Sequence, residues 1–176
     1  MQRTVLIGAQ EIERTIARLA QQILEPEESQ SGPVILGVRR GGEALATRIA
    51  LEIERSTGRR PALGFLNINL YRDDRVVHEV PESQIPVDIG GRLLLIVDDV
   101  LYTGRTIRSA LDAVTDLGRP AAIRLCVLVD RGQRELPIQP DYVGRTIASK
   151  RGERVEVRLA LEPSSADEVV LHAHSS

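Results

Sequence analysis

LLLIVDDVLYTGRT, residues 93–106, joins five apolar residues to two adjacent carboxylates and then to a turn rich in glycine and hydroxyl groups. A short continuous apolar run is typical of a strand that is buried on both faces, as in a parallel sheet. Asp98 and Asp99 are costly for folding alone, because burial disfavours a charge and a neighbouring charge of the same sign adds to that penalty. We therefore expect the two acids to serve a ligand.

The segments on either side of this stretch alternate between strand and helix patterns. Helical spacing of apolar residues marks 9–25, 42–56 and 106–118, and apolar runs typical of strands occupy 34–38, 62–71, 92–97 and 121–129. Strict alternation over 154–161 predicts a further strand with Val155, Val157, Leu159 and Leu161 on one face. In the third helix Leu117 is expected to face inward with the other apolar residues. The order predicts an α/β fold in one domain, residues 1–176, with a mainly parallel twisted sheet flanked by helices.

Composition limits the class of protein. The chain is 42% hydrophobic and 27% charged, has a formal charge of −2, and contains a single cysteine, Cys126, within an apolar run. No disulfide can form within the chain, and no segment approaches the roughly 18 apolar residues of a membrane span. We expect a cytoplasmic protein without a membrane partner. Lys150 is the only lysine, which either genome composition or the use of arginine for phosphate recognition would explain.

Two features of the pattern point to a ligand site at one edge of the sheet. Ligands of open α/β sheets bind beyond the carboxyl ends of the strands. Three informative segments fall at such ends, namely 39–42, 98–106 and 130–132. The polar segment at about 71–90 has no clear period, which is unusual in a compact domain unless it forms a flap over the site.

The acidic turn admits four interpretations. A helix N-cap would explain one Asp or Thr but not the whole string. A nucleotide hydrolase would need a G-x-x-x-x-G-K-[ST] loop upstream, and Lys150 lies downstream. A phospho-acceptor pocket would need acids near the first buried strand, where the chain has GVRRGGE.

The fourth interpretation, a phosphoribosyl diphosphate (PRPP) site, uses every part of the string. Asp98 and Asp99 would accept hydrogen bonds from the ribose hydroxyls and help to place a substrate-bound Mg²⁺, indirectly through substrate or water. The 5′-phosphate would lie on the helix start formed by Thr103, Gly104, Arg105 and Thr106. Glycine permits close approach of the backbone there, and the helix dipole favours the anion.

The motif resembles the diphosphate-sugar signature of the type I phosphoribosyltransferases. NLYRDD (69–74), DLGRPAAI (116–123) and VLVDRGQRELPI (127–138) narrow the resemblance to the bifunctional pyrimidine operon attenuation proteins of that family, over about residues 5–161. The resemblance implies that Arg40, Gly41 and Gly42 bind the diphosphate. It also implies that Arg72 closes over the diphosphate as a catalytic residue with Asp98 and Asp99.

The resemblance further implies the reaction and its partners. Uracil and PRPP would give UMP and pyrophosphate with Mg²⁺ as cofactor, and Asp130, Arg131 and Gly132 would contact uracil, with backbone groups near 147–155. UMP or UTP would promote binding to a hairpin in the pyr mRNA leader, and the protein would form a homo-dimer or tetramer. The RNA-binding candidates are Arg14, Arg18, Arg134, Arg145, Lys150 and Arg151.

One departure from the family pattern concerns only the residues expected to bind RNA. The family often has Thr and His on the first helix and His in the loop after the fourth strand, where this chain has Ala17, Gln21 and Gln133. The RNA contacts could therefore differ. A salvage phosphoribosyltransferase without an RNA role, and a nucleotide sensor with little turnover, are the alternatives.

Overall fold

A computed structural model of the chain describes residues 2–26, 32–72 and 82–173. The helices are α1 (Ala9–Leu24), α2 (Gly42–Thr57) and α3 (Arg105–Leu117), and a short 3₁₀ turn covers Asn69–Tyr71. The strands are β1 (Gln2–Gly8), β2 (Val34–Arg39), β3 (Leu63–Asn67), β4 (Leu93–Leu101), β5 (Ala122–Asp130), β6 (Tyr142–Thr146), β7 (Arg154–Arg158) and β8 (Glu168–Ala173).

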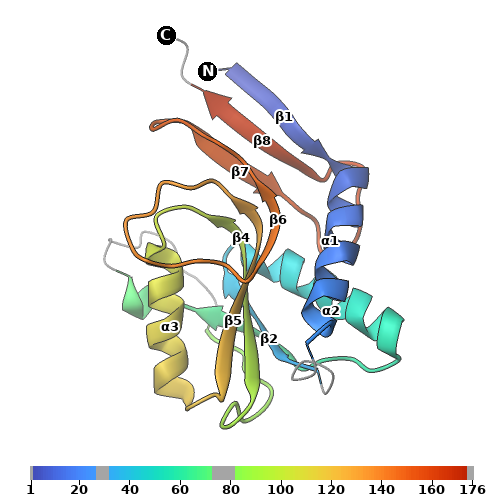
Figure 1. Ribbon diagram of the computed structural model, residues 1–176, viewed down its shortest axis with the longest axis vertical. Coiled ribbons are helices and arrows are strands. Elements are labelled where there is room, and N and C mark those ends of the chain that lie inside the picture. The colour runs from blue at the N-terminus through green and yellow to red at the C-terminus, as the bar shows by residue number, and fades with distance from the viewer. Residues whose placement is uncertain (1, 27–31, 73–81, 174–176) are drawn as a thin grey trace.

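The larger sheet is parallel, with the strand order β3-β2-β4-β5-β6. Helix α3 covers one face, and α1 and α2 cover the other (Figure 1). Side chains of the central strand β4 alternate between the two layers, since Leu94 and Ile96 pack with α3 whereas Leu95 and Val97 pack with α1 and α2. The predicted α/β architecture is confirmed.

A second, antiparallel sheet of three strands, in the order β1-β8-β7, lies beyond one end of the larger sheet (Figure 1). It brings the two ends of the chain side by side. The buried ion pair between Arg48 of α2 and Asp167 (2.6 Å) links this sheet to the body of the protein. Asp167 also accepts hydrogen bonds from the backbone N–H groups of Ala160 and Ser164. The sequence analysis did not predict β1, β6 or β8.

Two apolar side chains were placed wrongly by periodicity. Leu117, the last residue of α3, is 45% exposed, and Gly118 ends the helix directly after it. Leu161 is 58% exposed, since β7 ends at Arg158 and the chain then turns toward Asp167. The predicted alternation therefore holds from Val155 to Leu159, which pack on one core cluster, and fails at Leu161.

The predicted flap at about 71–90 falls partly on residues 73–81, which lie outside the described residues. The segment that follows returns along β3. The backbones of Phe65 and Gln84 exchange two hydrogen bonds of 2.8 Å, and the hydroxyl of Ser83 accepts a hydrogen bond from the Asn67 N–H. These bonds hold one end of the segment next to the edge strand.

Cys126 lies in the core, and burial raises the pKa of its thiol to about 12. The thiol therefore stays protonated and unreactive at neutral pH. Among the described residues, no helix combines the length and apolar character needed to cross a bilayer.

Candidate active site

The three predicted ligand-binding segments lie at one edge of the larger sheet. β2, β4 and β5 are adjacent and parallel, so the segments that follow them, 39–42, 98–106 and 130–132, meet at their carboxyl ends. β4 is longer than predicted and continues through both acids to Leu101. The acids therefore belong to a rigid strand rather than to a loop.

Of the two adjacent carboxylates, Asp98 is buried and Asp99 is partly buried. Asp98 is 4% exposed, and its Oδ1 accepts a hydrogen bond from the Asp99 N–H at 2.9 Å. Asp99 Oδ1 accepts one from the Val100 N–H at 2.7 Å. Burial, and then the charge of Asp99, raise the pKa of Asp98 well above its ordinary value, and burial also raises the pKa of Asp99. The site thus holds a pair of carboxyl groups that a cation or hydroxyl donors would stabilise in the ionised form.

The glycine loop after β2 packs directly against these acids. A Cβ atom on Gly41, whose φ is +104°, would lie 2.9 Å from the carboxylate of Asp99. A Cβ atom on Gly42 would lie 2.2 Å from the carbonyl oxygen of Val97 in β4. At Gly42 any side chain would displace the strand backbone, and at Gly41 it would meet the Asp99 carboxylate and strain a positive φ. The loop backbone is therefore held next to Asp99. Arg40 is exposed at the start of this loop.

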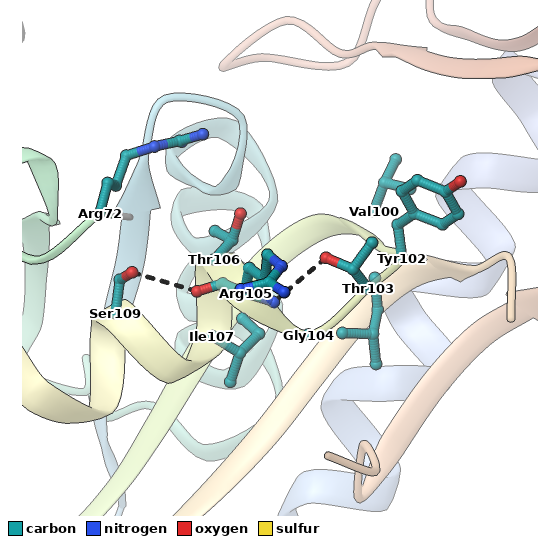
Figure 2. A pocket seen from close by; sticks show the side chains of 10 residues that line it. Arg72, Val100, Tyr102, Thr103, Gly104, Arg105, Thr106, Ile107 and Ser109 are labelled. Carbon is teal, nitrogen blue, oxygen red and sulfur yellow. Dashed lines mark hydrogen bonds between the residues drawn. The ribbon is translucent and has the colours of Figure 1, made fainter. Parts of the chain in front are cut away.

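A cavity of about 420 Å³ opens beside the turn that follows β4 (Figure 2). Tyr102, Thr103 and the first turn of α3 form one side, with Gly104 as the residue that precedes the helix. The Thr103 hydroxyl accepts a hydrogen bond from the Arg105 N–H at 3.3 Å. The first N–H groups of a helix have no acceptor within it and attract anions. The cavity is therefore suited to a phosphate.

Two arginines, Arg72 and Arg105, line this cavity. The Arg105 side chain pairs with Glu135 at 2.6 Å, so the backbone of this residue is the part available for a phosphate. Arg72 stands on the opposite wall in Figure 2. The chain just before it is anchored to α3, since the Ser109 hydroxyl donates to the Tyr71 carbonyl (3.0 Å) and the Tyr71 hydroxyl donates to Asp116 (2.6 Å).

The loop after β5 uses its polar side chains to bond to neighbouring segments. Asp130 accepts hydrogen bonds from the Gly132 N–H (2.9 Å) and from Arg134 (2.7 Å). Burial raises the pKa of Asp130, but these two bonds outweigh it, and the pKa lies below its ordinary value. Arg131 is buried and donates to Ser149 and to the carbonyl of Glu153. Only a backbone contact to uracil would leave these bonds intact.

The RNA-binding candidates differ in their surroundings. Arg134 is partly buried and also donates to the carbonyls of Tyr102 and Ile138. Arg18 bonds to the carbonyl of Gly144 at 2.6 Å, and Arg145 pairs with Glu11 across the α1–β6 contact. Arg14 lies on the exposed face of α1, and Lys150 and Arg151 are exposed in the loop before β7. The last two directly follow Ser149, which bonds to Arg131 and Gln133 of the loop after β5.

The donor set around Asp98 and Asp99 matches a magnesium ion carried by the substrate. The described residues contain no cluster of three or more His, Cys, Asp or Glu side chains that could bind a metal by themselves. Magnesium in sites for phosphate substrates is held by one or two carboxylates, by phosphate oxygens and by water. Two neighbouring carboxyl groups beside the glycine loop supply the protein's share of such a shell.

Three residues at the site were missed by the sequence analysis. Tyr102 and Ser109 line the cavity, and Ser149 bonds to Arg131. Ser109 carried a signal, because it is a polar residue on the buried face of α3, one turn after Arg105. Ser149 carried none, since its role depends on a contact with a residue 18 positions away.

Comparison with known proteins identifies the family of the chain. The sequence profile of the phosphoribosyl transferase domain matches residues 6–159, which is most of the chain. The chain belongs to the phosphoribosyltransferase family. Within this family it is similar to the bifunctional protein PyrR of Chloroflexus aurantiacus, with 46% identity over 94% of this chain and 93% of that protein. It is also similar to the bifunctional protein PyrR of Roseiflexus sp., with 48% identity over 88% and 86% of the two chains.

Solved phosphoribosyltransferase structures share the fold. The hypoxanthine phosphoribosyltransferase of Trypanosoma cruzi aligns with a TM-score of 0.71 over 96% of this chain and 95% of that chain. Its sequence identity is 20%, so the likeness concerns the fold and not the base that is used. The predicted phosphoribosyltransferase fold and the predicted resemblance to the pyrimidine attenuation branch are both confirmed.

Proposed function

We propose that this chain is a pyrimidine-responsive regulator of pyr gene expression that also converts uracil and PRPP to UMP and pyrophosphate. The cavity beside Thr103 supports the enzymatic half, because strand β4, which leads to it, carries Asp98, buried, and Asp99, partly buried, just before the start of α3. Two acids followed by a helix start would match the two ribose hydroxyls followed by the 5′-phosphate of a ribose 5-phosphate. Similarity to the PyrR proteins over nearly the whole chain supports the pairing of this chemistry with regulation.

The ribose end of PRPP would lie over Asp98 and Asp99, and the 5′-phosphate on the backbone of residues 103–106. Ionised carboxylates accept hydrogen bonds from both sugar hydroxyls. Asp98 and Asp99 would also help to hold Mg²⁺ indirectly, through substrate or water, and the ion would supply positive charge to the diphosphate. Because burial raises the pKa of both acids, substrate binding should drive a proton from this pair.

The departure of pyrophosphate would depend on the loop 40–42 and on Arg72. The bond between C1 of ribose and the diphosphate would break as positive charge grows on the sugar. The uracil nitrogen would form the new bond and release its proton to water. Backbone N–H groups of Gly41 and Gly42 would hold the leaving diphosphate beside Asp99, together with Arg40. Preorganised donors of this kind stabilise charge as it develops. No covalent intermediate with the protein is required.

Uracil would lie toward the loops 130–132 and 147–155. Because Asp130 and Arg131 already bond within the protein, we assign the reading of the base edge chiefly to backbone groups of these loops, Gly132 included. The proposed partners are PRPP, uracil, UMP or UTP and the pyr mRNA leader hairpin, with the protein acting as a homo-dimer or tetramer.

Initial rates with PRPP and Mg²⁺ test the enzymatic half. We expect UMP formation with uracil and at least a hundredfold lower kcat/KM with hypoxanthine, since a site built to hydrogen-bond one base edge rejects another. Preference for hypoxanthine would favour the alternative, a salvage enzyme without RNA regulation. UMP binding without turnover would favour a sensor.

Arg72→Ala should raise KM for PRPP about tenfold and lower kcat by about 10- to 100-fold, because Arg72 faces the cavity and carries the charge that balances the diphosphate. Arg108→Ala is the matched control, since Arg108 is an exposed arginine on α3 that pairs with Asp112. Steady-state kinetics at varied PRPP gives both parameters. Kinetics equal to the control would remove Arg72 from the site.

For the regulatory half, the double variant Lys150→Ala/Arg151→Ala should weaken binding to the leader hairpin of its own pyr message by at least tenfold. Both side chains are exposed near the base end of the site, and phosphate contacts dominate affinity for RNA. The dependence of log affinity on log salt should become shallower by about 1 to 2.

Filter binding with and without UMP measures this effect. Arg59→Ala/Arg60→Ala, which removes two exposed cations from the segment before β3, is the charge-matched control. Equal affinity for the two double variants would place the RNA surface elsewhere.

A further inference from the structure

The loop between β5 and β6 is bonded on one side to the turn that forms the proposed phosphate site. The N–H groups of Glu135 and Leu136 both donate to the carbonyl of Thr103, at 2.9 and 3.1 Å. The Arg131 N–H donates to the carbonyl of Leu101 at 3.0 Å, and Arg134 donates to that of Tyr102 at 3.0 Å. The turn therefore depends on this loop for its position.

The same loop is bonded on its other side to the segment 147–153. The Ile147 N–H donates to the carbonyl of Asp130 at 2.8 Å, and the Gln133 side chain donates to the carbonyl of Ser149. This segment contains the backbone groups to which we assign the reading of uracil. The loop after β5 thus lies between the two ends of the proposed nucleotide site.

One side chain, Arg131, contacts both neighbours at once. Its guanidinium carbon lies 4.1 Å from the centre of the Tyr102 ring, on the side of the phosphate turn. Its Nε donates to the Ser149 hydroxyl at 2.9 Å, and a terminal nitrogen donates to the carbonyl of Glu153 at 2.8 Å. Arg131 is 6% exposed, so these bonds form where water does not compete.

The cost of this arrangement argues for a role beyond filling space. A buried guanidinium must be satisfied by hydrogen bonds or by an aromatic face, and here these partners come from two separate segments. Lysine could keep the charge over the ring but could not make both directed bonds, since only arginine has the planar fork.

We infer that Arg131 is a positioning residue that joins the phosphate turn to the base-reading segment and so allows both ends of UMP to bind together. It acts through Tyr102, Ser149 and Glu153 and not by contact with uracil. This inference rests on the proposed function, because it assumes that a nucleotide spans the two segments.

The test compares a ligand that spans both segments with one that reaches the phosphate turn only. Calorimetric titration with UMP and with ribose 5-phosphate should show that Arg131→Ala raises Kd for UMP at least tenfold and Kd for ribose 5-phosphate less than threefold. Arg131→Lys should lie between Arg131→Ala and wild type and covers the case in which Arg131→Ala does not fold. Arg124→Ala, near the opposite end of β5, the strand that precedes Arg131, is the matched control.

Variants of the partners separate positioning from direct contact. Ser149→Ala and Tyr102→Leu leave Arg131 in place, and each should weaken UMP binding in the same direction as Arg131→Ala. Normal UMP affinity in both would mean that Arg131 contacts the base directly and would overturn the inference. Equal losses for UMP and ribose 5-phosphate would reduce Arg131 to a structural role and overturn it as well. Wild-type protein that binds ribose 5-phosphate but not UMP would instead refute the proposed function, and the inference with it.

Discussion

Asp99→Asn is expected to lower kcat for UMP synthesis by about a thousandfold while the fold remains intact. Asparagine has nearly the same shape, and its carbonyl oxygen can still accept the Val100 N–H. The charge that would face the ribose and the magnesium-bound diphosphate is lost. Steady-state kinetics with uracil and PRPP measures the effect, and a rate within threefold of wild type would exclude Asp99 from catalysis.

The same substitution should not destabilise the protein at neutral pH, and Asp98→Asn should stabilise it. Burial raises the pKa of Asp98 in the folded chain, whereas the unfolded chain has a pKa of about 4. Folding therefore takes up a proton between these two values, and wild-type stability falls as the pH rises through that window. Asparagine carries no such penalty.

The expected gain for Asp98→Asn is about 1 kcal/mol at pH 8, or roughly 2–4 °C in Tm. It should shrink as the pH falls and disappear below about pH 3, where Asp98 is protonated in both the folded and the unfolded chain. Thermal unfolding of wild type and variant at a series of pH values measures the difference. A variant that is less stable at pH 8 would show that the carboxylate is satisfied without a ligand.

Gly42→Ala is expected to be the most damaging single change in the glycine loop. The new Cβ atom would lie 2.2 Å from the carbonyl oxygen of Val97, a backbone atom in the central strand that cannot turn away as a side chain would. Overpacking of this kind costs about 3 kcal/mol, which lowers Tm by roughly 10 °C. The shift of the loop should also raise KM for PRPP.

Gly8→Ala provides the control for Gly42→Ala. Gly8 precedes α1 with a φ of −95°, and a Cβ atom there would meet nothing within 4 Å. The Tm of the Gly8→Ala variant should remain within about 2 °C of the wild-type value, since only a small change in helix capping is involved. If Gly42→Ala behaves like this control, the packing of the loop against β4 does not constrain the site.

The parts of the fold that the sequence predicted are those in which local pattern and tertiary environment agree. The apolar run 93–97 reads as a buried strand and lies at the centre of the sheet. The spacing of Ile12, Ile16 and Leu19 reads as a helix face, and all three side chains are buried. Each signal is contained within a few neighbouring residues.

The second sheet could not be predicted in this way, because its pairing joins opposite ends of the chain. Gln2 to Val5 are exposed, so β1 carries no alternation that marks a strand. Its hydrogen bonds go to β8, more than 160 residues later, with Arg3 opposite His172. The strand exists because of that partner and not because of its own sequence.

Arginines at the site show a similar limit to what can be predicted from the sequence. The family resemblance implied that Arg131 contacts uracil and made Arg134 a candidate for RNA contact. The structure gives both side chains acceptors within the protein, up to 32 residues away along the chain. The residue type indicates a need for several hydrogen bonds, but only the fold shows whether protein or ligand supplies them.

A crystal structure of the protein with UMP and Mg²⁺ would test the central claim most directly. The account predicts the phosphate within about 3 Å of backbone N–H groups of residues 103–107, and the ribose hydroxyls within hydrogen-bond distance of Asp98 and Asp99. A nucleotide bound away from the carboxyl end of β4 would contradict it.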